Sequence, residues 1–315
     1  MEEEEDSVLA SAEENEFIDI SNIKQWDIKT IPENFFMLIA SKRRSGKTHL
    51  VRHILKPLHK RFDRAYLFSE TAHLQADDPY DYIPSAHRYN HFDEDVIRGI
   101  LSAQANIKEQ QKKFKESQRV QHHVLIILDD VITGPEIRRS QGLKSLATQG
   151  RHSDVSVICL SQTISAKSGF PSVIRDNVDI FICFTLHSVF NRETSAECYA
   201  SIVNKKEGIK LINSITQEKP YQVAAFDLSI TNVKKYEDYV FKYIAPADKG
   251  AKFVIGDENE KREAVKNMND SSFLFHTSGH REAPSDLFKF DEGFPSWTLK
   301  SSVPFKPVKK NKGKT

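Results

Sequence analysis

A short segment before residue 49 combines small residues with a lysine and a hydroxyl side chain. Residues 41–48 read SKRRSGKT. Backbone N–H groups in such a turn can point at an anion, the lysine adds a positive charge, and the hydroxyl can bind Mg²⁺. Here Lys47 would contact the outer phosphates of a nucleotide, and Thr48 the metal ion. The segment therefore predicts a site for ATP and Mg²⁺.

One position of this segment departs from the pattern G-x-x-x-x-G-K-[ST], because Ser41 stands where the first glycine is expected. That glycine provides a permissive backbone turn, and serine can adopt some such turns. The residues expected to bind the nucleotide are Lys47 and Thr48 with Ser41, Arg44, Ser45, Gly46 and His49. The alternative is that the basic residues between positions 42 and 47 form an exposed surface loop.

Two adjacent carboxylates end an apolar run about 80 residues further on, in VLIILDD over 124–130. A strand that carries a magnesium-binding aspartate is expected at about this place after a phosphate loop. Asp129 would hold Mg²⁺ directly or through water, and Asp130 would polarise the attacking water. Two carboxylates at the end of a buried strand are costly to desolvate unless a cation or hydrogen bonds compensate. The pair therefore favours a nucleotide site over a surface loop.

A glutamine follows the next apolar run, VSVICLSQ over 155–162. In an open α/β sheet, ligands bind at the carboxyl ends of the strands. Gln162 could therefore sense the terminal phosphate or orient the water. The alternative is a glutamine at a strand end that faces solvent.

The elements that must position these residues follow one another as apolar strands and helical segments. We expect strands in FFMLIA, RAYLFS, VLIIL, VSVICLSQ, VDIFICF and YQVAAFDL, and helices over 48–55, 92–118, 136–149 and 193–217. Pro57 should end the first helix. Apolar strands separated by helices predict an α/β fold, with a mainly parallel sheet and helices on both faces.

The composition, with 39% apolar and 28% charged residues, is typical of a soluble globular protein, and no apolar run approaches a membrane span. We expect a flexible acidic N-terminal extension over 1–30, a P-loop ATPase domain over 31–245 and a C-terminal extension with a basic tail over 246–315. The three cysteines, Cys159, Cys183 and Cys198, lie in apolar or helical contexts. This predicts buried thiols in a reducing, intracellular compartment.

Four segments together resemble the genome-packaging ATPases of poxviruses and other large DNA viruses, within the FtsK/HerA superfamily of P-loop motors. They are SGKT (45–48), ILDD (127–130), GRHSDVSVICLSQT (150–163) and IRDNVDIFICF (174–184). The GRH before one strand, the SQ at its end and the R-x-N before the next strand are the most specific part. The resemblance covers about residues 33–230.

The resemblance implies a RecA-like ATPase that assembles as a homo-oligomeric ring and drives double-stranded DNA of any sequence into a capsid. It implies an extra strand between the loop strand and the Asp129 strand, which would place Gln162 beside the γ-phosphate. Lys47, Asp130 and Gln162 would then be catalytic, with Thr48 and Asp129 on the metal ion. Capsid proteins would be partners, and the protein would work in the host cytoplasm or nucleus at sites of virus assembly, or in the virion.

A ring motor commonly inserts an arginine into the site of a neighbouring subunit. Arg151 and Arg175 are the candidates, because both lie beside the ends of predicted strands. Each could equally form a structural ion pair.

Other functions remain open at this point. A helicase or another DNA-dependent P-loop ATPase would share the whole nucleotide site, and a virion protein could bind nucleotide as a structural ligand. A GTPase is disfavoured, because the closest match to Asn-Lys-x-Asp is NKKE over 204–207. A small-molecule kinase is disfavoured too, because residues 200–220 contain no arginine for a lid.

Overall fold

The computed structural model describes residues 17–74, 78–116, 119, 122–132, 137–201, 203–247 and 252–256. Most of the predicted acidic extension and the basic tail lie outside these residues. Inside them, Ile23 and Trp26 are buried before the first strand, and Phe253 and Ile255 are buried after the last. Parts of both predicted extensions therefore contribute to the core, while the domain limits stay a prediction.

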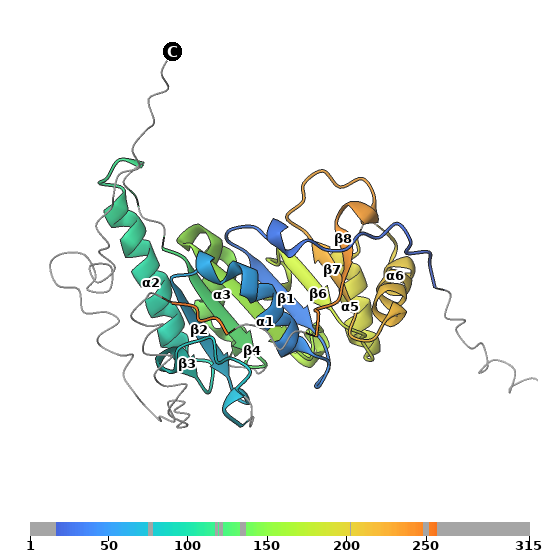
Figure 1. Ribbon diagram of the computed structural model, residues 1–315, viewed down its shortest axis with the longest axis horizontal. Helices are drawn as coiled ribbons and strands as arrows, with labels where there is room; N and C mark the ends of the chain where they lie inside the picture. Colours follow the sequence, from blue (N-terminus) through green and yellow to red (C-terminus); the bar gives the residue numbers. More distant parts are fainter. Residues whose placement is uncertain are drawn as a thin grey trace, which may run out of the picture.

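The described residues form one eight-stranded sheet in the order β3-β2-β4-β5-β1-β6-β7-β8 (Figure 1). The strands are β1 (Phe36–Ala40), β2 (Arg64–Ser69), β3 (Arg88–Tyr89), β4 (Val124–Asp129), β5 (Val155–Ser161), β6 (Ile180–Cys183), β7 (Val223–Asp227) and β8 (Val240–Tyr243). All pairings from β3 to β6 are parallel, whereas β6–β7 and β7–β8 are antiparallel. The predicted mainly parallel sheet is confirmed.

The strand β5 lies between β1 and β4. This is the extra strand that the family resemblance implies between the loop strand and the Asp129 strand, and it is confirmed. Both β4 and β5 are buried along their whole length, as unbroken apolar runs covered on two faces should be. The carboxyl ends of β1, β5 and β4 therefore lie side by side at one edge.

Helices cover both faces of the sheet, as predicted. They are α1 (Lys47–Leu58), α2 (Glu94–Gln111), α3 (Gln141–Gln149), α4 (Ser172–Arg175), α5 (Val189–Tyr199) and α6 (Lys205–Glu218). Met37 and Ile39 pack with α1 on one face, and Leu38 packs with α2, α3, α5 and α6 on the other. On the face that α1 covers, residues 80–83 and 253–255 also pack against the sheet.

Several predicted boundaries are wrong. Pro57 does not end α1 but lies in its last turn, one residue before Leu58, where little helix remains to be disrupted. Helix α2 is shorter than the predicted 92–118 and begins after the cap Asp93. The helical region over 193–217 is two helices, because the chain leaves α5 at Ala200 and Asn204 caps α6.

The cysteine prediction is correct for two residues and wrong for one. Cys159 on β5 and Cys183 on β6 are buried, whereas Cys198 is exposed on α5. Tyr199, the next residue, is the one that packs against the sheet, stacked on Phe181. Because neighbouring helix positions point about 100° apart, Cys198 faces solvent.

Candidate active site

The predicted phosphate loop connects the end of β1 to the start of α1. Gly46 caps α1 with φ 94°, and Arg44 has φ 62°. The two left-handed residues of the loop therefore lie shortly before the start of α1. Ser41 is fully buried and its N–H donates to the Ser161 carbonyl at 3.0 Å. The Ser45 hydroxyl donates to the Ser41 hydroxyl at 2.7 Å. Ser41 therefore needs no glycine-like conformation, and its side chain ties the two ends of the turn together.

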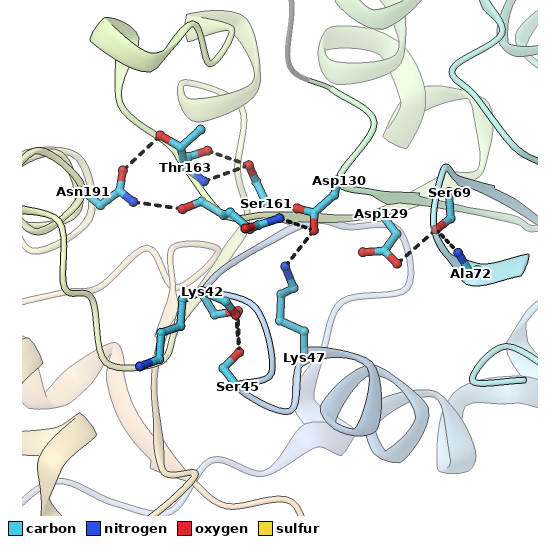
Figure 2. Close-up of polar contacts among 12 residues, drawn as sticks. Lys42, Ser45, Lys47, Ser69, Ala72, Asp129, Asp130, Ser161, Thr163 and Asn191 are labelled. Carbon is cyan, nitrogen blue, oxygen red and sulfur yellow. Dashed lines mark hydrogen bonds and ion pairs between the residues drawn. The ribbon is translucent and has the colours of Figure 1, made fainter. Parts of the chain in front are cut away.

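Three of the predicted catalytic residues meet at one oxygen atom (Figure 2). The Lys47 ammonium lies 3.2 Å from Oδ2 of Asp130, and the Gln162 amide donates to the same oxygen at 2.9 Å. Lys47 begins α1, Asp130 follows β4 and Gln162 follows β5. Asp130 has φ 55°, an uncommon conformation for a residue other than glycine, and its N–H donates to the Leu160 carbonyl at 3.0 Å. The backbone turn thus aims the carboxylate at the loop.

The carboxylate of Asp129, the other member of the acidic pair, is held by a tyrosine. The Tyr80 hydroxyl donates to Oδ2 of Asp129 at 2.9 Å, and the Ser69 hydroxyl donates at 3.3 Å. The Thr48 side chain lies close enough to Tyr80 to act against the rise in the pKa of Tyr80 that burial causes. Tyr80 therefore lies near both predicted metal ligands and bonds one of them, Asp129.

Burial raises the pKa of Asp129, and the negative charge of Asp130 raises it further. The hydrogen bonds from Tyr80 and Ser69 and the charge of Lys47 act in the other direction. Asp129 has only 6% of its surface exposed. A buried carboxylate next to a second one gains from a bound cation, so the donor set of Asp129 and the Thr48 hydroxyl fits Mg²⁺.

Sequence reasoning missed the residues that support this site. Ser69 ends β2, and Tyr80 lies in an irregular segment that carries no periodic pattern. Asn191 of α5 donates to the Gln162 carbonyl at 3.0 Å and accepts from the Ile164 N–H at 3.2 Å. The polar residue at the end of the strand RAYLFS was the one signal available, since strand ends at this edge face the ligand. Asn191 could not be found because its partners lie on another element.

The two candidate arginines lie in different places. Arg151 precedes β5, at the edge of the sheet opposite the phosphate loop, and pairs with Asp179 at 3.1 Å. Arg175 ends α4 and donates to the Ile164 carbonyl at 3.2 Å, close to the strand end that carries Gln162. His49 contacts the Pro246 carbonyl at 2.9 Å, on the flank of α1 away from Tyr80. The structure thus places His49 beside the loop, Arg175 next to the residues that follow Gln162, and Arg151 at the opposite edge of the sheet.

Comparisons with known proteins give one family match and several more distant similarities. The model of the family described as Poxvirus A32 protein matches residues 24–241. The uncharacterized protein 015R of frog virus 3 (isolate Goorha) is 22% identical over 273 residues, which cover 79% of this chain and 80% of that protein.

Two solved structures are similar to this chain at low sequence identity. The pCW3 conjugation coupling protein TcpA, in its monomer form with ATPγS, has a TM-score of 0.49 and 16% identity, covering 81% of this chain and 75% of that one. The genome packaging NTPase B204 of Sulfolobus turreted icosahedral virus 2, in complex with AMPPCP, has a TM-score of 0.43 and 14% identity, covering 68% of this chain and 100% of that one.

Within the described part of this chain, no helix is both long and apolar enough to cross a membrane.

The fold and the site define the class of protein. A parallel sheet with a Gly-Lys-Thr loop after β1, an acidic pair after β4 and β5 between these two strands is the core of a P-loop ATPase. The match over residues 24–241 spans more than half of the chain. The protein belongs to the Poxvirus A32 family, which confirms the resemblance to viral genome-packaging ATPases.

Proposed function

We propose that this P-loop ATPase is a motor that moves double-stranded DNA into a viral capsid. The observation that carries the proposal is the meeting of Lys47 and Gln162 at one oxygen of Asp130, beside the buried Asp129. A phosphate loop, an acidic pair and a polar residue at the adjacent strand end are the parts that hydrolysis of a terminal phosphate requires. Membership in a viral family supports packaging as the purpose of the hydrolysis.

In this proposal, the loop from Ser41 to Thr48 holds the phosphates through its backbone N–H groups, and Lys47 neutralises their outer charge. Thr48 and Asp129 hold the metal ion. When bound, Mg²⁺ would supply positive charge against the developing charge of the transferred phosphoryl group. Tyr80 fixes the Asp129 carboxylate through its hydrogen bond.

Asp130 takes the proton of the attacking water. The Lys47 ammonium lies 3.2 Å from Oδ2 of Asp130. Arriving phosphates attract Lys47 more strongly because they carry more negative charge, and this leaves the carboxylate free to polarise water. Gln162, which already contacts Asp130 at 2.9 Å, orients that water and responds to the loss of the terminal phosphate. Asn191 carries this response to α5.

The proposed partners are duplex DNA, contacted through its backbone without regard to sequence, other copies of the chain in a ring, and capsid proteins. The ring supplies an arginine to the site of each neighbour, and Arg151 and Arg175 are the candidates. Arg151 is half-exposed and pairs with Asp179, whereas Arg175 donates to the Ile164 carbonyl. The protein acts in the infected cell, in the cytoplasm or nucleus where virions assemble.

The test is steady-state ATP hydrolysis by the full chain without DNA, with duplex DNA and with single-stranded DNA. We expect stimulation by duplex DNA, and a loss of about 100-fold or more in Lys47→Ala and Asp130→Asn, since a positioned base contributes on the order of 10²–10⁴-fold. Lys60→Ala is the matched control, because this exposed lysine follows α1 outside the site.

Two outcomes would contradict the proposal. Stimulation by single-stranded DNA alone would favour a helicase. ATP binding that depends on Lys47, with no turnover under any condition, would favour a structural nucleotide site.

A further inference from the structure

An exposed aromatic side chain lies against the phosphate loop and has no role in the site described so far. Tyr221 is 69% exposed. A Cβ atom placed on Gly46 would lie 3.6 Å from Cδ1 of Tyr221 and 3.9 Å from Cε1 of Phe184. The Tyr221 ring thus borders the residue that caps α1, while most of the ring faces solvent.

The backbone of Tyr221 is held in an unfavourable conformation. Its φ is 62°, which is uncommon for a bulky residue. The next residue, Gln222, is buried and fixes the turn: its N–H donates to the Lys219 carbonyl at 3.2 Å and its amide donates to the Ile215 carbonyl at 2.7 Å. Strain of this kind persists only where the surrounding structure enforces it, and it concentrates at ligand sites. The turn therefore presents the tyrosine ring outward.

The position of Tyr221 in the sheet fixes which end of a nucleotide it could meet. Asp130 and Gln162 follow β4 and β5, on one side of β1, and Tyr221 precedes β7, on the other side. A nucleotide whose terminal phosphate lies at Lys47, Asp130 and Gln162 must extend away from β5. Its base end therefore points toward β6 and β7.

The contacts on the two flanks of α1 are consistent with this direction of the nucleotide. Thr48 lies near Tyr80, which bonds Asp129, on one flank. His49 bonds the carbonyl of Pro246, which follows β8, on the other flank. Gly46, the exposed Tyr221 and this His49 contact thus lie on the side of α1 away from the metal site, toward which the base end of a nucleotide points.

We propose that Tyr221 is the residue on which the base of the bound nucleotide stacks. This inference rests on the proposed nucleotide site. Every base has a π-face, and stacking on an aromatic side chain contributes about 1–3 kcal/mol per base. The contact needs the ring and not the hydroxyl, and no described side chain beside it reads the edge of a base. Tyr221 therefore strengthens binding of ATP and GTP alike.

The test compares a nucleotide with a ligand that has phosphates but no base. Dissociation constants of ATP, GTP and inorganic tripolyphosphate with Mg²⁺ are measured by calorimetry for the full chain, Tyr221→Ala, Tyr221→Phe and Lys47→Ala. We expect Tyr221→Ala to weaken ATP and GTP by roughly 5- to 100-fold, which corresponds to the stacking range, and to change tripolyphosphate less than about 2-fold. Tyr221→Phe should bind like the wild type. Phe114→Ala, at an exposed aromatic residue beyond α2, is the matched control.

The outcomes separate this inference from the proposed function. Equal weakening of ATP and tripolyphosphate in Tyr221→Ala would mean that the ring supports the loop, and the inference would fall. The inference would also fall if ATP affinity did not change while Lys47→Ala still abolished binding, and the nucleotide site would then stand. If the wild type bound neither ATP nor tripolyphosphate, both would fall.

Discussion

Asp129 lowers the free energy of unfolding while it contributes a carboxylate to the candidate site. Its pKa is raised above the ordinary value of 3.8, first by burial and then by the charge of Asp130. The folded protein therefore holds the Asp129 proton more tightly than the unfolded chain does. It follows that ionising Asp129 costs stability: the cost is absent below the unfolded pKa and complete above the folded one.

We predict that Asp129→Asn raises the melting temperature of the nucleotide-free protein at neutral pH in the absence of Mg²⁺. An asparagine oxygen still accepts from Tyr80, and the buried charge is gone. In a domain of this size, each kcal/mol of relief corresponds to about 2–4 °C. The gain should shrink as pH falls through the raised pKa of Asp129 toward 3.8. Thermal scans of both proteins across pH measure this difference.

The control for this comparison is Asp176→Asn, at an exposed carboxylate after α4. Its melting temperature should follow the wild type at every pH. A lower melting temperature for Asp129→Asn at neutral pH would show that the hydrogen bonds of Tyr80 and Ser69 to the charged form outweigh its burial.

At the scale of elements, α5 and α6 pack closely against each other at one glycine of α6. A Cβ atom on Gly208 would lie 3.1 Å from the Cβ atoms of both Ala196 and Ala200. A branched side chain at this place must push the helices apart, and such overpacking typically costs about 1–3 kcal/mol. Because Asn191 of α5 holds the strand end of Gln162, the movement should also reach the site.

We therefore predict that Gly208→Val lowers the melting temperature and also reduces ATP turnover. The matched control is Lys206→Val, which places the same β-branched residue at an exposed position of α6. Valine is a poorer helix former than lysine and a better one than glycine, so a larger loss of stability in Gly208→Val reports the crowding and not helix propensity. A normal melting temperature in Gly208→Val would contradict the close contact between the two helices.

The elements differ in how far the sequence could predict them. The strands from β1 to β7 that carry long apolar runs were predicted, because burial on both faces leaves an unambiguous pattern. The two-residue β3 and the half-buried β8 carry too little pattern to be found. The break between α5 and α6 was missed because Asn204, as a helix cap, forms a local hydrogen bond inside an otherwise helical composition.

The residues of the candidate site also differ in how far the sequence could predict them. Lys47, Thr48 and the two aspartates can be proposed from the sequence because each lies on a local motif, and Gln162 because it ends a strand; their roles stay predictions. Tyr80 and Asn191 come from segments whose place beside the site depends on the packing of the whole chain. The role of Tyr221 could not be predicted either, since a tyrosine before a strand looks like any turn residue until its φ and its contact with Gly46 are known.

At the scale of the whole molecule, we propose that hydrolysis moves the protein along duplex DNA. Contacts to the phosphate backbone carry no sequence information and weaken steeply with salt. A motor of this kind should therefore work on any duplex sequence. It should also leave the two strands paired, unlike a helicase.

The most direct measurement is displacement of a third strand from a duplex track by the full chain in the presence of ATP. We predict ATP-dependent release of the third strand from tracks of unrelated sequence, with the duplex left intact, and no release by Asp130→Asn. Release of one strand of the duplex itself would contradict the account and indicate a helicase. Duplex-stimulated hydrolysis without any displacement would show that this chain spends ATP without moving along DNA.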